Sequence, residues 1–422
     1  MTHPRSLFVV AAFGVAGVGT PGARPISALQ SALVVTDSVA HLEALAREPM
    51  VVQHPGGALF VSGYAAGEDP TGVPNIWRSD DGGASWHRLD VGTAEDGAAG
   101  NSDVDLAIGP DGTVYFLAMG FDRAELVGTH IAIGVSRDLG ASWEWTYLSR
   151  DRFDDRPWVE VAPDGRVHVI WNDGSGVSHA VSTDAGRSWT KSERIHPLGG
   201  SSHLAVGPGG EIAVRITPAS ASGNRLDPEA DVIAIGFDGG QSWTKHPPPG
   251  DLTWTATFHP DSLIRWVEPL AWDATGALYH LWSEGRNLWL GRSADRGATW
   301  ERWRVASDEE RVMFPYLVAR GEGELAATWY SGVRDGLRGN VAWITLGGEG
   351  REPVVERSAP IAVNAWSRDG SRRDTAGEYI PVTFLRDGGL GVVTTVQNTT
   401  TGERGFIWWR FERGVGLPGG TS

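Results

Sequence analysis

A short motif with the pattern Ser-x-Asp-x-Gly-x-x-Trp recurs along this chain. Full copies occupy residues 79–86, 136–143, 182–189 and 293–300. A degenerate fifth copy, with Gly236 in place of the serine, ends at Trp243. The five tryptophans are 57, 46, 54 and 57 residues apart. Self-similarity at such a period is typical of repeat architectures, so we expect one closed array of similar units.

The motif is typical of a turn between two strands. An aspartate carboxylate accepts hydrogen bonds from the backbone amides of its own turn, and glycine adopts backbone conformations that other residues resist. The tryptophan is expected to pack between neighbouring sheets, with its indole N–H available to a partner. We therefore interpret the motif aspartates as fold residues rather than catalysts or metal ligands; they are Asp81, Asp138, Asp184 and Asp295.

Residues 154–191 show the whole unit. Four strand-like segments are separated by turns, and they span residues 156–162, 166–171, 177–182 and 189–191. Alternating apolar residues in the second segment are typical of a half-buried strand. Four antiparallel strands per unit make one blade of a β-propeller.

Seven such units can be counted by their first strands, which begin near Arg47, Ser102, Asp154, Ser201, Trp266, Met313 and Ala376. The seventh unit shows only three strands, and the strand-like segment 32–36 near the N-terminus can supply the fourth. A borrowed strand closes the ring and removes an exposed sheet edge. We predict an all-β fold, a β-propeller of four-stranded antiparallel blades; seven blades are favoured, and six is the alternative if one unit is an insertion.

The N-terminus has the pattern of a secretory signal peptide. Arg5 precedes the apolar run 7–18, and small residues and prolines follow up to Ala28. A charged start, a short apolar core and a small-residue exit define such leaders, although a buried N-terminal strand is the alternative. We expect a signal peptide at 1–28, one propeller domain at 29–415 and a tail at 416–422, and hence a secreted or periplasmic protein.

Composition narrows the classes of partner. The formal net charge of −16 disfavours nucleic acid and anionic membranes, which need a basic surface. The chain has no cysteine, which excludes disulfides, thiol catalysis and cysteine-based zinc sites. No metal-ligand spacing or cofactor motif stands out, and no stretch after the N-terminal run is suited to membrane insertion. We expect no metal and no cofactor, and a monomer by default.

These repeats resemble the Asp-box (BNR) repeats of the sialidase (neuraminidase) family. The resemblance implies a site in which three arginines clamp a sugar carboxylate, since guanidinium groups match carboxylates in charge and shape. It also implies a tyrosine nucleophile with a glutamate as its base, an exception to the two-carboxylate scheme of most glycosidases. The family's propeller has six blades, so a seventh unit would widen the ring and separate the arginines.

The resemblance assigns three candidate catalytic residues. Tyr379 opens the last inner strand, nine residues before the turn residue Gly388, and takes the place of the nucleophile. Glu268, in a Glu-Pro pair that opens an inner strand, takes the place of its base. Asp69, in the loop before the first Asp box, takes the place of the acid that protonates the leaving group.

Three arginines are candidates for binding the substrate. Arg47 begins an Arg-x-Pro motif at the first inner strand and matches the family's first arginine. Arg286 takes the place of the second. Arg338 takes the place of the third, with Arg334 as the alternative.

A second hypothesis is a non-catalytic binding site at the mouth of the central channel, where the inner strands begin. Asp155 and Arg156 open the third unit and precede Trp158, and charged and aromatic groups at a funnel mouth suit sugar binding. The sequence thus favours a glycan or glycoconjugate as partner. It leaves open an exo-acting sialidase-type hydrolase and a non-catalytic secreted propeller that binds a glycan or a protein.

Overall fold

The computed structural model describes residues 33–65, 72–218, 227–250, 267–308, 311–332, 337–347, 350–363, 377–398 and 401–414. Several sequence predictions fall outside these ranges: the signal peptide at 1–28, the tail at 416–422, and the candidate residues Asp69 and Arg334.

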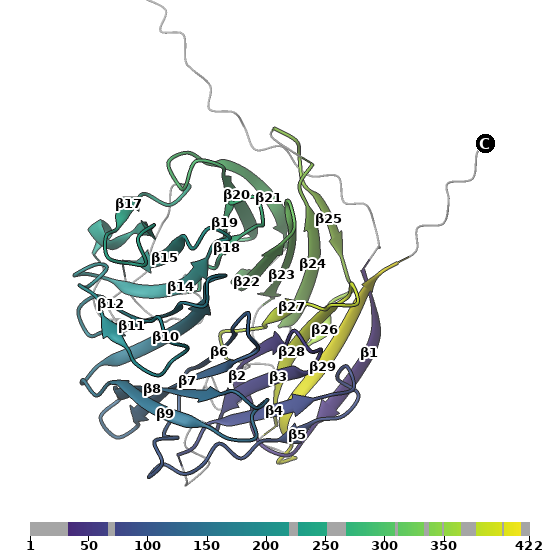
Figure 1. Cartoon of the computed structure of the whole chain (residues 1–422). Coiled ribbons are helices and arrows are strands. Elements are labelled where there is room, and N and C mark those ends of the chain that lie inside the picture. The colour runs from purple at the N-terminus through teal and green to yellow at the C-terminus, as the bar shows by residue number, and fades with distance from the viewer. Residues whose placement is uncertain are drawn as a thin grey trace, which may run out of the picture.

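The described chain forms seven antiparallel sheets arranged as a β-propeller (Figure 1). Blade 1 comprises β2 (Arg47–Gln53), β3 (Leu59–Tyr64), β4 (Asn75–Ser79) and β5 (His87–Arg88). Blade 2 comprises β6 (Val104–Ile108), β7 (Val114–Asp122), β8 (Val127–Ser136) and β9 (Glu144–Ser149). Blade 3 comprises β10 (Asp154–Val161), β11 (Val167–Asp173), β12 (Val177–Ser182) and β13 (Thr190–Lys191). Blade 4 comprises β14 (Gly200–Val206), β15 (Ile212–Thr217), β16 (Val232–Gly236) and β17 (Thr244–His246). Blade 5 comprises β18 (Leu270–Trp272), β19 (Leu278–Glu284), β20 (Asn287–Ser293) and β21 (Glu301–Ser307). Blade 6 comprises β22 (Val312–Arg320), β23 (Glu324–Ser331), β24 (Arg338–Thr345) and β25 (Val354–Arg357), with β26 (Ile361–Ala362) also paired to β24. Blade 7 comprises β27 (Val382–Phe384), β28 (Leu390–Gln397), β29 (Arg404–Arg413) and β1 (Leu33–His41).

The N-terminal strand closes the ring, as predicted. β1 pairs with β29 from Leu33 opposite Arg413 to His41 opposite Phe406, and the two strands lie side by side in Figure 1. The outermost strand of blade 7 is therefore the first strand of the sequence. Seven blades, rather than six, are present.

The recurring turns are held by their own side chains. In blade 1, Asp81 accepts hydrogen bonds from the Ser85 amide (2.9 Å), the Ser85 hydroxyl (2.6 Å) and the Ser79 hydroxyl (2.8 Å). The Ser79 hydroxyl in turn accepts a bond from the Gly83 amide at 2.9 Å. The same set of bonds recurs around Asp138, Asp184 and Asp295. These carboxylates are fully engaged in the turns.

Large aromatic side chains pack where blade 7 meets blade 1. The ring of Trp86, which ends the first turn motif, lies 5.6 Å from that of Trp408 and 5.3 Å from that of Phe406. Gly83 has φ +99°, and a side chain there would overlap the Trp408 indole. The turn motif of blade 1 therefore fits directly against the aromatic residues of blade 7.

The only helix among the described residues is the short 3₁₀ turn η1 (Pro228–Ala230). Within those residues, no helix has the length and apolar character needed to cross a membrane.

The packing at the closure predicts a large loss of stability for Trp408→Ala. Trp408 is fully buried, and removing a buried tryptophan costs about 3–5 kcal/mol. Urea denaturation should show a midpoint shifted accordingly. Val34→Ala, at an exposed position of β1, is the control and should change the free energy of unfolding by no more than about 0.5 kcal/mol. A Trp408→Ala protein as stable as this control would contradict the role given to the closure.

Candidate functional site

Charged side chains from four consecutive blades meet where the inner strands begin. The group consists of Arg47 and Glu48 (blade 1), Asp103 (blade 2), Asp155 and Arg156 (blade 3), and Glu378 and Tyr379 (blade 7). We call this group the mouth cluster, because the inner strands line the central channel and these residues stand at their starts. Among the sequence candidates, it brings together Arg47, Asp155, Arg156 and Tyr379.

The backbone is strained at two residues of the mouth cluster. Glu48 has φ +46° and Arg156 has φ +47°, and each precedes a proline. Left-handed backbone at such residues costs of order 1–3 kcal/mol and is found mainly at functional sites. Each also lies in a β-bulge, because the strand register shifts between Arg47 and Met50 and between Asp155 and Trp158. A bulge re-aims a side chain, so we infer that the strain serves to direct Glu48 and Arg156 into the mouth.

An ion pair between blades 3 and 7 organises the centre of the cluster. Arg156 Nη2 donates to Glu378 Oε2 at 3.0 Å, and Arg156 Nε lies 4.0 Å from Asp155 Oδ2. The backbone of Arg156 is fixed by the Ser201 hydroxyl, which donates a hydrogen bond to the Arg156 carbonyl at 2.9 Å. The Arg156 guanidinium therefore links Glu378 of blade 7 to Asp155 of blade 3.

Tyr379 is buried against aromatic neighbours. Its ring meets Trp158 edge-on at 5.5 Å, and the Tyr330 hydroxyl donates to its carbonyl at 3.3 Å. Burial raises the pKa of Tyr379 well above its usual value; Arg156 opposes this shift, and Glu378 reinforces it. The phenol is thus neutral at physiological pH and lies next to both an arginine and a glutamate.

Burial raises the pKa of the other carboxyl groups of the cluster and so favours their protonated forms. It raises the pKa of Glu48, with added repulsion from Asp103 and Glu378. It also raises the pKa of Asp103 and of Asp155, in both cases against the attraction of Arg156. Like charges in a buried site disfavour one another's ionisation, so the mouth cluster combines carboxyl groups of raised pKa with Glu378, which is paired with Arg156.

Glu268 lies in a different cluster, between blades 4 and 5. Its Oε2 accepts from Arg215 Nε at 2.9 Å and lies 2.7 Å from Arg215 Nη2, and Arg215 also binds Asp231 at 2.6 Å. Arg215 and Glu268 are both fully buried. The contacts seen here join Glu268 to a buried ion network rather than to Tyr379, so its role as the base for Tyr379 stays a prediction.

Arg286 and Arg338 both meet Asp308, at the junction of blades 5 and 6. The Asp308 amide donates to the Arg286 carbonyl at 2.9 Å, and Arg338 Nη2 donates to Asp308 Oδ1 at 3.3 Å. They belong to blades other than the four that form the mouth cluster. Within the described residues, the arginines of the mouth cluster are Arg47 and Arg156.

Sequence reasoning missed three members of the mouth cluster: Glu48, Asp103 and Glu378. Glu48 is the second residue of β2 and Asp103 directly precedes β6, whereas Glu378 lies four residues before β27. Glu48 and Glu378 adjoin the predicted residues Arg47 and Tyr379. Aligning the first strands of blades 1 to 3 on the turn glycines Gly57, Gly112 and Gly165 would have placed Glu48, Asp103 and Arg156 at equivalent positions, nine residues before each glycine.

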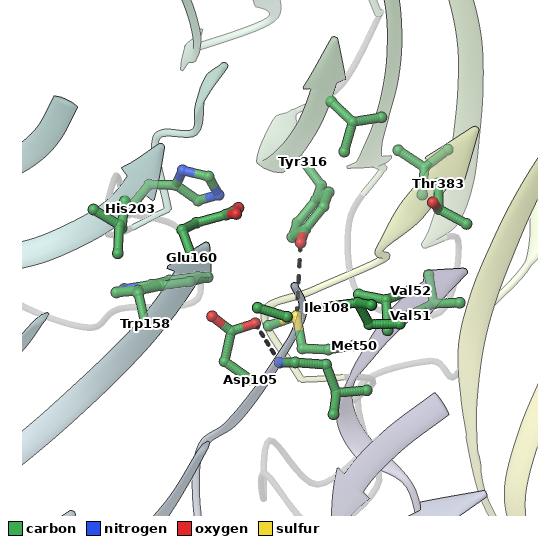
Figure 2. Close-up of a pocket in the computed structure, with 15 residues that line it drawn as sticks. Met50, Val51, Val52, Asp105, Ile108, Trp158, Glu160, His203, Tyr316 and Thr383 are labelled. Carbon is green, nitrogen blue, oxygen red and sulfur yellow. Dashed lines mark hydrogen bonds between the residues drawn. The ribbon is translucent and has the colours of Figure 1, made fainter. Parts of the chain in front are cut away.

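A cavity of about 160 Å³ lies further along the channel (Figure 2). Its walls come from the inner strands of six blades, and Asp105, Trp158, Glu160, His203 and Tyr316 contribute polar or aromatic groups. Burial raises the pKa of Asp105 to about 7, and burial together with repulsion from Asp105 raises that of Glu160 to about 8.

No family model matches the sequence, and no curated protein is detectably similar to it. Solved structures share the fold. An α-L-arabinofuranosidase of glycoside hydrolase family 93 from Fusarium graminearum has 12% identity and a TM-score of 0.51, covering 88% of this chain and 97% of that one. A PL25 ulvan lyase has 13% identity and a TM-score of 0.52, covering 88% and 95%. A GH74 xyloglucanase from Xanthomonas campestris has 13% identity and a TM-score of 0.52, covering 88% and 55%. These propellers act on glycans, and at such identity the likeness establishes the fold.

The buried ion network predicts that Glu268→Ala destabilises the protein. Removing one partner of a buried ion pair costs about 3–5 kcal/mol, because the other charge is left buried with less compensation. Urea denaturation measures the effect, and Glu324→Ala, which removes an ion pair with the half-exposed Arg320, is the control. A wild-type midpoint for Glu268→Ala would show that the network contributes little to the fold.

The raised pKa of Glu160, which lies near Asp105 in the channel, predicts that Glu160→Gln increases the stability of the protein at high pH. The pKa of Glu160 is about 8 in the folded protein and about 4.3 when unfolded, so the folded state holds a proton that the unfolded state releases. The resulting penalty on stability is absent below about pH 4, grows as the pH rises and is complete above pH 8. Thermal unfolding of Glu160→Gln should match the wild type at pH 4 and exceed it at pH 8.5 by about 1 kcal/mol or more. An equal difference at both pH values would contradict this assignment.

Proposed function

We propose that this protein is a glycoside hydrolase that acts on a glycan at the mouth cluster. The observation that carries the proposal is the division of roles among four carboxyl groups. Glu48, Asp103 and Asp155 are driven toward the protonated form, whereas Glu378 is ion-paired with Arg156. Glycosidases use one carboxylic acid and one carboxylate on either side of the bond they cleave. The fold shared with glycan-acting enzymes supports the same class of substrate.

In this mechanism Glu48 is the general acid and Glu378 the base. The Glu48 proton passes to the glycosidic oxygen as the bond between that oxygen and the anomeric carbon breaks. Glu378 takes a proton from a water molecule, whose oxygen forms the new bond to the anomeric carbon. Arg156 holds the Glu378 carboxylate in place at 3.0 Å, and the strained backbone at Glu48 directs the acid toward the mouth.

A sialidase-type mechanism is the second candidate, and the position of Tyr379 favours it. Tyr379 would attack the anomeric carbon, Glu378 would accept the phenolic proton, and Arg47 and Arg156 would bind a sugar carboxylate. The contact between Arg156 and Glu378 weighs against it, because Glu378 already binds the Arg156 guanidinium at 3.0 Å and competes with a sugar carboxylate for it. We propose that the export suggested by residues 1–28 brings either enzyme to glycans outside the cytoplasm.

Activity on a panel of aryl glycosides, with neutral sugars and sialic acid as glycones, tests the proposal. Glu48→Gln and Glu378→Gln should each lower kcat/KM by about 10²–10⁴, the range for loss of a general acid or base. Glu48→Gln should also remove the alkaline limb of the pH profile, because the acid must carry its proton. Glu324→Gln, outside the mouth cluster, should keep wild-type activity.

Tyr379→Phe separates the two mechanisms. It should abolish turnover of a sialoside if Tyr379 is the nucleophile, and it should leave most of the turnover of a neutral glycoside if Glu378 is the base. A folded wild-type protein with no turnover on the whole panel would overturn both and favour a non-catalytic propeller that binds a glycan.

A further inference from the structure

The channel cavity takes no part in the proposed reaction, yet it is built like a binding site. Figure 2 shows Asp105, Glu160, His203 and Tyr316 around it, on inner strands of four different blades. At ~30 Å³ per water molecule, its volume of about 160 Å³ holds about five waters. A single sugar ring with its hydroxyl groups has a comparable volume, and two linked rings exceed it.

Acceptors and donors both face the cavity. Asp105 Oδ2 is fixed by the Val159 amide at 2.8 Å and Oδ1 by the Leu106 amide at 2.8 Å. Each carboxylate oxygen can accept further bonds, so Asp105 has capacity left for a ligand. Glu160, on the next blade, lines the same space.

His203 supplies a buried donor. Its side chain lines the cavity and is only 6% exposed. Its Nδ1 accepts from the Leu270 amide at 3.3 Å, which leaves the hydrogen of the neutral ring on Nε2. Burial lowers the pKa of His203 to about 3, so the ring is neutral. Within the described residues, no hydrogen bond is seen for Nε2, so this nitrogen can donate to a ligand in the cavity that His203 lines.

Tyr316 adds a hydroxyl from blade 6. The contact seen for this hydroxyl is with the thioether of Met50 at 3.8 Å, and a thioether is a weak acceptor. Trp158 and Tyr316 also present aromatic rings to the cavity, and aromatic rings pack well against the apolar faces of sugars.

The lining disfavours anionic ligands and metal ions. Among the described residues that line the cavity there is no lysine or arginine, so an anionic ligand would have no counter-ion. No group of three or more histidine, aspartate or glutamate side chains in the described chain is placed to hold a metal. Acceptors, neutral donors and aromatic walls together match a ligand rich in hydroxyl groups.

We propose that the channel cavity is a subsite for one neutral sugar ring, the terminal residue of the glycan. This inference rests on the proposed function and makes the enzyme exo-acting. Trp158 joins the two sites, because its ring contacts Tyr379 of the mouth cluster at 5.5 Å and also lines the cavity beside His203 at 4.9 Å. A terminal sugar in the cavity therefore leaves its glycosidic bond near the carboxyl groups of the mouth cluster.

The product pattern on oligosaccharides labelled at the reducing end tests the subsite. The wild type should release monosaccharides and shorten the ladder one unit at a time. Val318→Phe places a ring in the cavity, which Val318 lines, and should lower monosaccharide release by about tenfold or more, as expected when a pocket excludes a substrate group. Val318→Thr keeps the volume and is the matched control, with thermal unfolding to confirm that both variants are folded.

Saturation-transfer NMR with free arabinose, xylose, galactose and rhamnose separates the subsite from the proposed function. Binding of at least one sugar to the wild type and to Glu378→Gln, lost in Val318→Phe, supports the subsite even if no glycan is hydrolysed. Hydrolysis that yields internal fragments, at an equal rate in Val318→Phe, overturns the subsite and leaves the hydrolase intact. Absence of both sugar binding and monosaccharide release overturns the subsite as well.

Discussion

The pairing of β1 with β29 is the interaction on which the rest of the structure depends. A single four-stranded blade cannot bury both of its faces, so each blade relies on its neighbours, and the ring is stable only when the last blade meets the first. The closure also creates the mouth cluster, because Glu378 and Tyr379 come from blade 7, whereas Arg47 and Glu48 come from blade 1. The Thr395 hydroxyl of blade 7 donates to the Ala46 carbonyl at 2.8 Å, directly before Arg47. Fold and candidate site therefore share one junction.

The fold was predictable because its signals are local. Each turn motif satisfies its own hydrogen bonds within eight residues, so the pattern around Asp81 or Asp184 can be recognised without knowledge of the rest of the chain. Blade 6 lacks the motif, yet its strands alternate clearly enough to be counted. The closing strand followed from a physical argument, since a seventh unit with three strands leaves an exposed edge.

The candidate site was only partly predictable, because its contacts are not local. Arg156 and Glu378 are 222 residues apart, and no spacing in the sequence indicates that they pair. Arg47, Asp155, Arg156 and Tyr379 were found because each stands at a strand start with a recognisable motif. Glu268 also lies near a strand start, but its ion-pair partner Arg215 lies in the middle of β15, where the sequence pattern does not indicate a buried charge. The sequence thus located the mouth and left the pairing of its charges undetermined.

The two groups of buried carboxyls differ in one feature, the presence of arginine. At the mouth, Arg156 is ion-paired with Glu378 while burial raises the pKa of Glu48, Asp103 and Asp155, and general acid–base catalysis needs both a proton donor and a proton acceptor. No arginine is among the described residues that line the channel cavity; burial raises the pKa of Asp105 and of Glu160, and repulsion from Asp105 adds to the shift of Glu160, so the neutral forms of both are favoured. A nearly neutral polar wall favours hydroxyl groups over ions. In the proposed function, the presence of arginine at the mouth and its absence among the described residues that line the cavity distinguish the reactive site from the sugar-binding site along the same channel.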